Sequence, residues 1–169
     1  YKNGFRLMKV DLEWTADEKL IINDESQMTV EDLETWMEEH LDAYIITDIV
    51  GEKDKAMKFI KYNLKDVKER FISQVEEMEE YYLIHTKGFK NIIMNLTDDK
   101  YTDEEILDFV ELYDHFGVAM SMDRAKGDLP KKLQDEGIYT YVYTIDTEIE
   151  RQKLENNGIY GIYTHELTP

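Results

Sequence analysis

Charged side chains stand at alternate positions of the run Arg6–Thr15, which reads RLMKVDLEWT. Successive side chains of a strand point to opposite faces, so Lys9, Asp11 and Glu13 would share one face. Asp48 closes the next run of this kind, AYIITDIV, and neighbouring strand ends would bring it beside Asp11. Carboxylate oxygens are the ligands that hard divalent cations prefer, so Asp11 and Asp48, with Glu13 as a further candidate, predict a site for Mg²⁺ or Ca²⁺.

Lys9 argues against such a metal site. Its ammonium group would lie where the cation should bind, and it would itself neutralise Asp11 or Asp48. A divalent ion placed beside this ammonium would be repelled. The sequence therefore predicts either no cofactor or a weakly bound Mg²⁺ or Ca²⁺.

Acid–base chemistry at such a site would also need a side chain that exchanges protons near neutral pH, and histidine is the usual one. Asn23, in the segment IIND, cannot do this. His165 follows the last expected strand and is the candidate proton carrier. The remaining histidines, His40, His85 and His115, fall in or at the ends of expected helices, away from the strand ends.

The elements that would position these residues follow a regular alternation. The expected strands are Arg6–Thr15, Leu20–Asn23, Ala43–Val50, Phe71–Val75, Phe89–Leu96, Val118–Met122, Ile138–Ile145 and Ile159–Thr164. The expected helices cover 29–40, 52–69, 76–87, 102–116, 128–136 and 147–157. Strands that alternate with helices of this length indicate parallel βα units.

Helix ends carry their own signals. Thr29 with Asp32, and Thr102 with Glu105, predict N-caps with an acidic first turn. Four glycines stand between a helical run and the next strand, where a left-handed C-cap is expected: Gly88, Gly117, Gly137 and Gly158.

We therefore predict an α/β fold, a TIM-type (β/α) barrel, in a single domain covering residues 1–169. Neither GxGxxG nor GxxxxGK[ST] occurs, which disfavours an open nucleotide-binding sheet. If the first two runs are one strand and its extension, the chain has about seven parallel units, whereas a complete barrel has eight and about 250 residues. The first βα unit would be missing, and the open sheet edges would invite a second copy or another segment to pair.

Composition limits the partners. The net charge of −18 argues against nucleic acid and anionic membrane surfaces. There are no cysteines, and no apolar run is long enough to span a bilayer. The chain starts at Tyr1 rather than methionine, so we expect a processed or partial chain. An upstream segment would then place it outside the cytoplasm or tether it to a membrane, with the cytoplasm as the alternative.

The chain resembles the glycerophosphodiester phosphodiesterase family over nearly its whole length. YKNGFRLMKVDLEWTADEKLIIND is similar to the family segment G-(Y/F)-R-x-x-E-x-D-x-x-x-T-x-D-G-K-x-V-x-x-H-D. The family's helix and E-x-K strand resemble the segment MTVEDLETWMEEHLDAYIITDIVG. Its late strand with W-T-(V/I)-(N/D) resembles the segment IYTYVYTID. NGIYGIYTHELTP is similar to its closing G-(V/I)-x-G-I-x-T-D-x-P. The resemblance implies a barrel in which two glutamates and an aspartate bind a divalent metal, and two histidines cleave glycerophosphodiesters to glycerol phosphate and an alcohol.

Several positions depart from this pattern. Lys9 replaces the metal-binding glutamate of E-x-D, and Asn23 replaces the histidine of H-D. The other histidine belongs to a strand that the chain lacks. Asp48 keeps the acidic position of the next strand, but Val50 replaces its basic partner. Tyr143 keeps the aromatic position that the resemblance places at the substrate mouth.

These departures favour a catalytically inactive domain that acts as a binding or scaffold module, with a glycerophosphodiester-like small molecule as its expected ligand. One alternative is a residual metal-dependent phosphodiesterase that uses Asp11, Glu13, Asp48 and His165. Another is a structural or oligomerisation domain that uses the open barrel edge.

Overall fold

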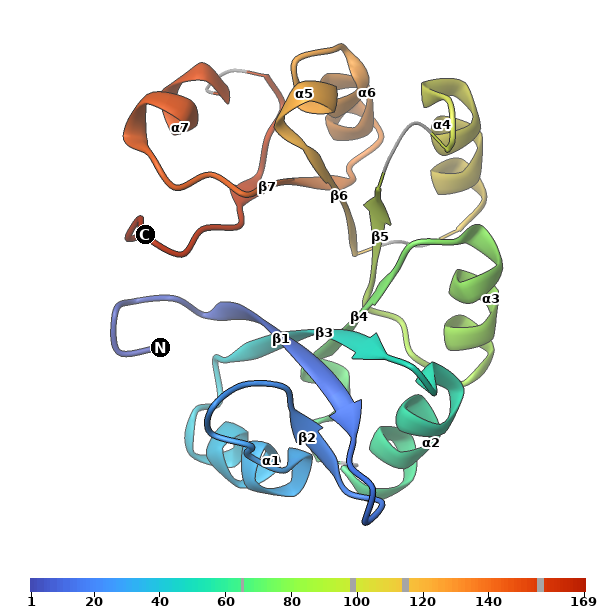
Figure 1. The fold of residues 1–169 in the computed structure, drawn as a ribbon. Coiled ribbons are helices and arrows are strands. Elements are labelled where there is room, and N and C mark those ends of the chain that lie inside the picture. Colours follow the sequence, from blue (N-terminus) through green and yellow to red (C-terminus); the bar gives the residue numbers. More distant parts are fainter. Residues whose placement is uncertain (65, 98–99, 114–115, 155–156) are drawn as a thin grey trace. The chain divides into compact units, whose positions relative to one another are not determined.

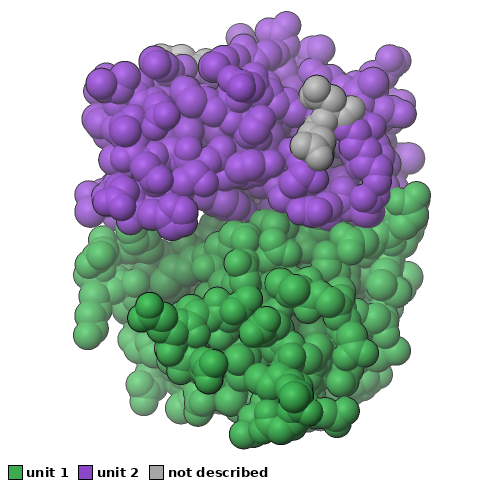
Figure 2. All heavy atoms as spheres, viewed as in Figure 1, with its two compact units in different colours: residues 1–75, 79–92 green, residues 76–78, 93–169 purple. Residues whose placement is uncertain are grey.

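The structure, a computed structural model, describes residues 1–64, 66–97, 100–113, 116–154 and 157–169. Two compact units make up the chain (Figure 2). Unit 1 comprises residues 1–75 and 79–92, and unit 2 comprises residues 76–78 and 93–169. Strands and helices alternate in both units, as the sequence predicts. None of the described helices is both long enough and apolar enough to cross a membrane.

Unit 1 begins with a β-hairpin (Figure 1). β1 (Leu7–Trp14) pairs antiparallel with β2 (Leu20–Ile22), so the second run turns back along the first instead of extending it. β3 (Tyr44–Val50) pairs in parallel with β1, and β4 (Phe71–Val75) with β3. The helical elements of this part are α1 (Val30–Glu39), α2 (Lys53–Asn63), the 3₁₀ helix η1 (Lys68–Arg70) and α3 (Met78–Thr86).

The alternation along β1 decides which side chains reach the site. Leu12 is fully buried, and Trp14, of the same parity, meets Phe59 of α2 with ring centroids 5.7 Å apart. This face is therefore the one that α2 covers. Lys9 and Asp11 have the opposite parity, so they point to the face away from α2.

The described residues of unit 2 form four parallel strands. They pair in the order β5 (Ile92–Leu96), β6 (Gly117–Ser121), β7 (Tyr139–Tyr143) and β8 (Gly161–Ile162). Its helices are α4 (Asp103–Leu112), α5 (Met122–Ala125), α6 (Leu129–Asp135) and α7 (Glu148–Leu154). With β1, β3 and β4 of unit 1, these strands match the seven parallel units expected from the sequence.

One predicted helix was too long. The run 52–69 becomes α2, which ends at Asn63, followed by the separate η1. Leu64 and Val67 continue the helical spacing of apolar residues and are buried, at 0% and 1% exposure, but from non-helical backbone. The spacing of the apolar residues therefore predicted correctly which side chains are buried, but it predicted a helix that is too long.

Acid is expected to weaken the capping box that starts α4. The backbone N–H of Thr102 donates to Glu105 Oε2 at 2.8 Å, and the N–H of Glu105 donates back to Thr102 Oγ1 at 3.3 Å. The first of these bonds, and then the Thr102 hydroxyl, lowers the pKa of Glu105 below its ordinary 4.5. Because the folded-state pKa is the lower one, this stabilisation is present above the ordinary value and is lost as the pH falls through the folded value.

Urea unfolding at about pH 6 and about pH 3 tests this, with Glu105→Gln as the comparison. The wild type should lose more stability than Glu105→Gln over this interval, because the amide does not titrate. An identical loss in both proteins would contradict the assignment.

Candidate functional site

Lys9 lies between two carboxylates near the carboxyl ends of β1 and β3. Asp11 and Asp48 stand directly opposite each other in the parallel register of these strands. Lys9 Nζ donates to Asp11 Oδ1 at 2.8 Å and lies 3.3 Å from Asp48 Oδ2. The structure thus brings together three of the residues that the sequence singled out, with the ammonium group between the carboxylates.

The charge of Lys9 is secured by this arrangement. Burial alone would lower its pKa, but the hydrogen bond to Asp11 and the negative charges of Asp48 and Asp11 outweigh burial and raise the pKa. Lys9 is therefore a fixed positive charge at neutral pH, and it offsets one of the two carboxylates.

Gln74 of β4 completes the cluster, and the sequence reasoning missed it. Its Nε2 donates to Asp48 Oδ2 at 2.8 Å, the same oxygen that faces Lys9. Gln74 is only 3% exposed, and its Oε1 is buried without a hydrogen-bond partner in the part of the chain that the structure describes. The available signal was a long polar side chain within the short buried strand FISQV.

A second cation lies near the end of β4. Lys53 Nζ pairs with both carboxylate oxygens of Glu80, at 2.9 and 3.0 Å, and its side chain is only 14% exposed. It is also 3.4 Å from the backbone oxygen of Gln74. Val50, which stands at the expected basic position, is 55% exposed and carries no charge. The positive charge of Lys53 is neutralised by Glu80. Lys53 therefore does not substitute for the basic residue that Val50 replaces.

The other predicted residues of unit 1 surround this cluster without joining its ion pairs. Glu13 continues the face of Asp11 and stands opposite Val50 in the register of β3. Asn23 is exposed, and its backbone N–H donates to the backbone oxygen of Asp11 at 2.8 Å. The hairpin thus holds Asn23 beside Asp11 through the main chain, but an amide side chain does not ionise near neutral pH and cannot act as an acid or a base.

Tyr143 and His165 belong to unit 2. The Tyr143 hydroxyl donates to the backbone oxygen of Leu96 at 3.0 Å. His165 is held through its backbone N–H, which donates to Asp146 Oδ1 at 2.8 Å and is the main reason that the pKa of Asp146 is lowered. Its imidazole is 79% exposed, with Nδ1 3.6 Å from Asp146 Oδ2. His115 lies outside the described residues.

The side chains present do not fit a divalent metal. Within the described ranges, no three histidine, aspartate or glutamate side chains come together in a way that could hold one. The two carboxylates that do come together, Asp11 and Asp48, share an ammonium group between them. A metal ion at this place would have to displace Lys9.

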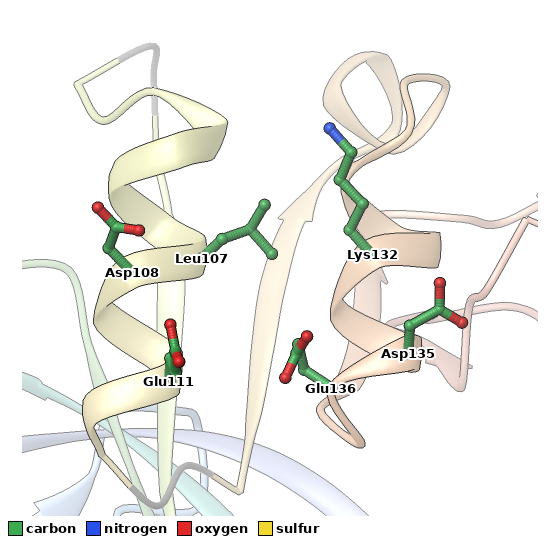
Figure 3. A pocket seen from close by; sticks show the side chains of 6 residues that line it. All are labelled: Leu107, Asp108, Glu111, Lys132, Asp135 and Glu136. Carbon is green, nitrogen blue, oxygen red and sulfur yellow. The ribbon is translucent and has the colours of Figure 1, made fainter.

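A separate hollow lies in unit 2 between α4 and α6 (Figure 3). Its volume is about 230 Å³, and it is lined by Leu107, Asp108, Glu111, Lys132, Asp135 and Glu136. All of the charged side chains that line it are exposed. It involves helix surfaces and none of the residues at strand ends.

No protein-family model and no curated protein matches the chain, but solved structures do. A glycerophosphodiester phosphodiesterase from Parabacteroides distasonis is 12% identical, with a TM-score of 0.71 over 96% of this chain and 81% of that one. A phosphodiesterase from Oleispira antarctica, in complex with the product sn-glycerol-3-phosphate, is 12% identical, with a TM-score of 0.59 over 96% and 82%. A glycerol uptake operon antiterminator regulatory protein from Listeria monocytogenes is 10% identical, with a TM-score of 0.59 over 95% and 81%.

The likeness extends over almost all of the chain, and at these identities it is a likeness of fold. It confirms the α/β class and the barrel type that the strand and helix order predicts. The chain therefore has the fold of the glycerophosphodiester phosphodiesterases.

Proposed function

We propose that this chain is a catalytically inactive glycerophosphodiester phosphodiesterase-like domain that acts as a binding or scaffold module. The observation that carries the proposal is the position of Lys9, whose ammonium lies between Asp11 and Asp48. A metal in such a place would polarise a phosphoryl oxygen and stabilise the negative charge of the transition state. An ammonium already paired with both carboxylates supplies much less of this effect.

Proton transfer is impaired as well. Asn23 stands where the sequence pattern of the family has histidine, and its amide cannot give a proton to a leaving group or take one from water. Val50 adds no charge for a phosphate oxygen. A glycerophosphodiester-like molecule is then a ligand to be held, not a substrate to be cleaved.

The comparisons offer indirect support for a role other than hydrolysis. The Listeria monocytogenes protein of this fold is described as regulatory, whereas the Parabacteroides distasonis protein is described as a phosphodiesterase. Proteins with both kinds of description therefore share the fold.

Two other functions have an observation in their favour. Residual hydrolysis at the carboxylates of unit 1, Asp11, Glu13 and Asp48, is favoured because solvent reaches both aspartates, whose side chains are 51% and 32% exposed. Pairing with a second copy or another segment is favoured by β1. One edge of β1 pairs with β3, and the other edge pairs with β2 only at Leu12–Trp14. No described strand pairs with this second edge at residues 7–10.

The wild-type chain is expected to release no glycerol phosphate from glycerophosphocholine or glycerophosphoglycerol, with or without Mg²⁺, Ca²⁺ or Mn²⁺. Product would be measured by a coupled glycerol-phosphate assay, with an active phosphodiesterase as the positive control. Isothermal calorimetry with the same compounds would detect binding without turnover. Release that disappears in Asp11→Asn would refute the proposal and select the residual enzyme.

A further inference from the structure

We propose that Lys9 is a tethered cation that takes the place of a metal ion, and that its removal turns the same cluster into a divalent-cation site which includes Gln74. The inference goes beyond the proposed function, because it concerns what the cluster does for the fold and which ions it admits. Three adjacent strands, β1, β3 and β4, contribute the residues involved.

Lys9 balances the charge across β1 and β3. Asp11 and Asp48 are direct register partners on adjacent strands. Like charges in such positions destabilise a sheet. The ammonium of Lys9, at 2.8 Å from one carboxylate and 3.3 Å from the other, converts this repulsion into a bridge between the strands.

Gln74 extends the cluster to β4. Its Nε2 fixes Asp48 Oδ2 at 2.8 Å, and its buried Oε1 has no hydrogen-bond partner among the described residues. An unsatisfied buried acceptor destabilises a fold, so its presence requires an explanation. Amide carbonyl oxygens, like carboxylates, are ligands of Ca²⁺. The cluster therefore retains three oxygen-bearing side chains, of which Lys9 engages two.

The ammonium of Lys9 excludes the ion because it is tethered and positively charged. Lys9 is held beside both carboxylates by its own backbone, so it competes at a high effective concentration. A divalent ion would meet its positive charge at short range. Without that charge, two carboxylates would face a cation with no competitor, and rotation of the Gln74 amide, whose Nε2 now points at Asp48, would turn its carbonyl oxygen toward the same carboxylate.

Lys9→Met tests this, because methionine keeps an unbranched apolar stem and removes the charge. Without divalent ions, Lys9→Met should melt below the wild type. Ca²⁺ at about 10 mM should raise its melting temperature by several degrees and leave that of the wild type unchanged. Calorimetry should show Ca²⁺ binding at least about 10-fold tighter in Lys9→Met than in the wild type.

Lys19→Met is the matched control, since Lys19 pairs with Asp17 at 3.1 Å on the surface and its removal changes the net charge equally. It should show no Ca²⁺-dependent shift. In Lys9→Met/Gln74→Leu the Ca²⁺ response should fall by at least half, because the third oxygen is gone. Equal responses of the wild type and Lys9→Met would overturn the inference, as would an undiminished response of the double variant.

If Lys9→Met is recovered only unfolded, refolding yields with and without Ca²⁺ decide the question. A yield that rises with Ca²⁺ supports the inference, and one that Ca²⁺ leaves unchanged overturns it. No substrate enters these measurements. Hydrolysis by the wild type would therefore defeat the proposed function while leaving this inference to be judged by its own results.

Discussion

Alanine in place of Gly158 is expected to lower the free energy of unfolding by about 2–5 kcal/mol. Gly158 has a φ of +76°, where a side chain costs about 1–2 kcal/mol. A Cβ at this position would also lie 2.9 Å from backbone atoms of Pro130 and Lys131. Backbone atoms at the start of α6 cannot swing aside as the tip of a side chain can, so the overpacking adds about 1–3 kcal/mol.

Gly137 provides the matched control. Its φ of +78° is nearly the same, but a Cβ there would have no atom within 4 Å. Gly137→Ala should therefore show only the backbone cost of about 1–2 kcal/mol. Urea unfolding of both variants separates the two contributions. Equal losses would mean that the close approach to Pro130 and Lys131 contributes nothing.

The sequence predicted helix ends well where a single residue type determines the backbone or the cap. Thr29 and Thr102 both form the expected capping boxes. Gly88, Gly137 and Gly158 have the positive φ that a left-handed C-cap needs. Gly117 was a wrong prediction, because it is the first residue of β6. Its lack of a side chain is explained by the Tyr139 carbonyl oxygen, 2.6 Å from where a Cβ would lie.

The candidate site could be predicted in part. Strand alternation placed Lys9 beside Asp11, and the parallel order placed Asp48 opposite Asp11. Gln74 could not be placed, since its meeting with Asp48 depends on the register between β3 and β4. Register across a crossover is set by packing of the intervening helix, and no short sequence pattern records it.

Arg70→Met is expected to destabilise the protein by about 2–4 kcal/mol. The guanidinium of Arg70 donates to the backbone oxygens of Met37, His40 and Ala43 at 2.8, 2.9 and 3.1 Å. The last carbonyls of a helix have no partner within the helix, and a positive charge also complements the dipole at this end of α1. Methionine removes the charged donor from all three oxygens, and only weaker backbone donors remain, from the His40 N–H to Met37 and from the Ala43 N–H to His40.

The planar arrangement of the guanidinium N–H groups, and not only their positive charge, should account for the loss of stability in Arg70→Met. Arg70→Lys keeps the charge but cannot reach three carbonyls in one planar arrangement, so it should recover less than half of the loss. Arg151→Met is the surface control. Arg151 pairs with Glu148 one helical turn away, and its replacement should cost no more than about 0.5 kcal/mol.

Arg70 also bears on the candidate site, through the segment that leads into β3. His40 and Ala43 lie between α1 and β3, and the register of β3 sets Asp48 opposite Asp11. Arg70→Met should therefore speed amide hydrogen exchange at the start of β3, whereas Arg151→Met should not. If both variants exchanged alike in β3, Arg70 would act only as the cap of α1. Faster exchange in Arg70→Met alone would mean that the stability of β3, and with it the Lys9 cluster, depends on the arginine that directly precedes β4.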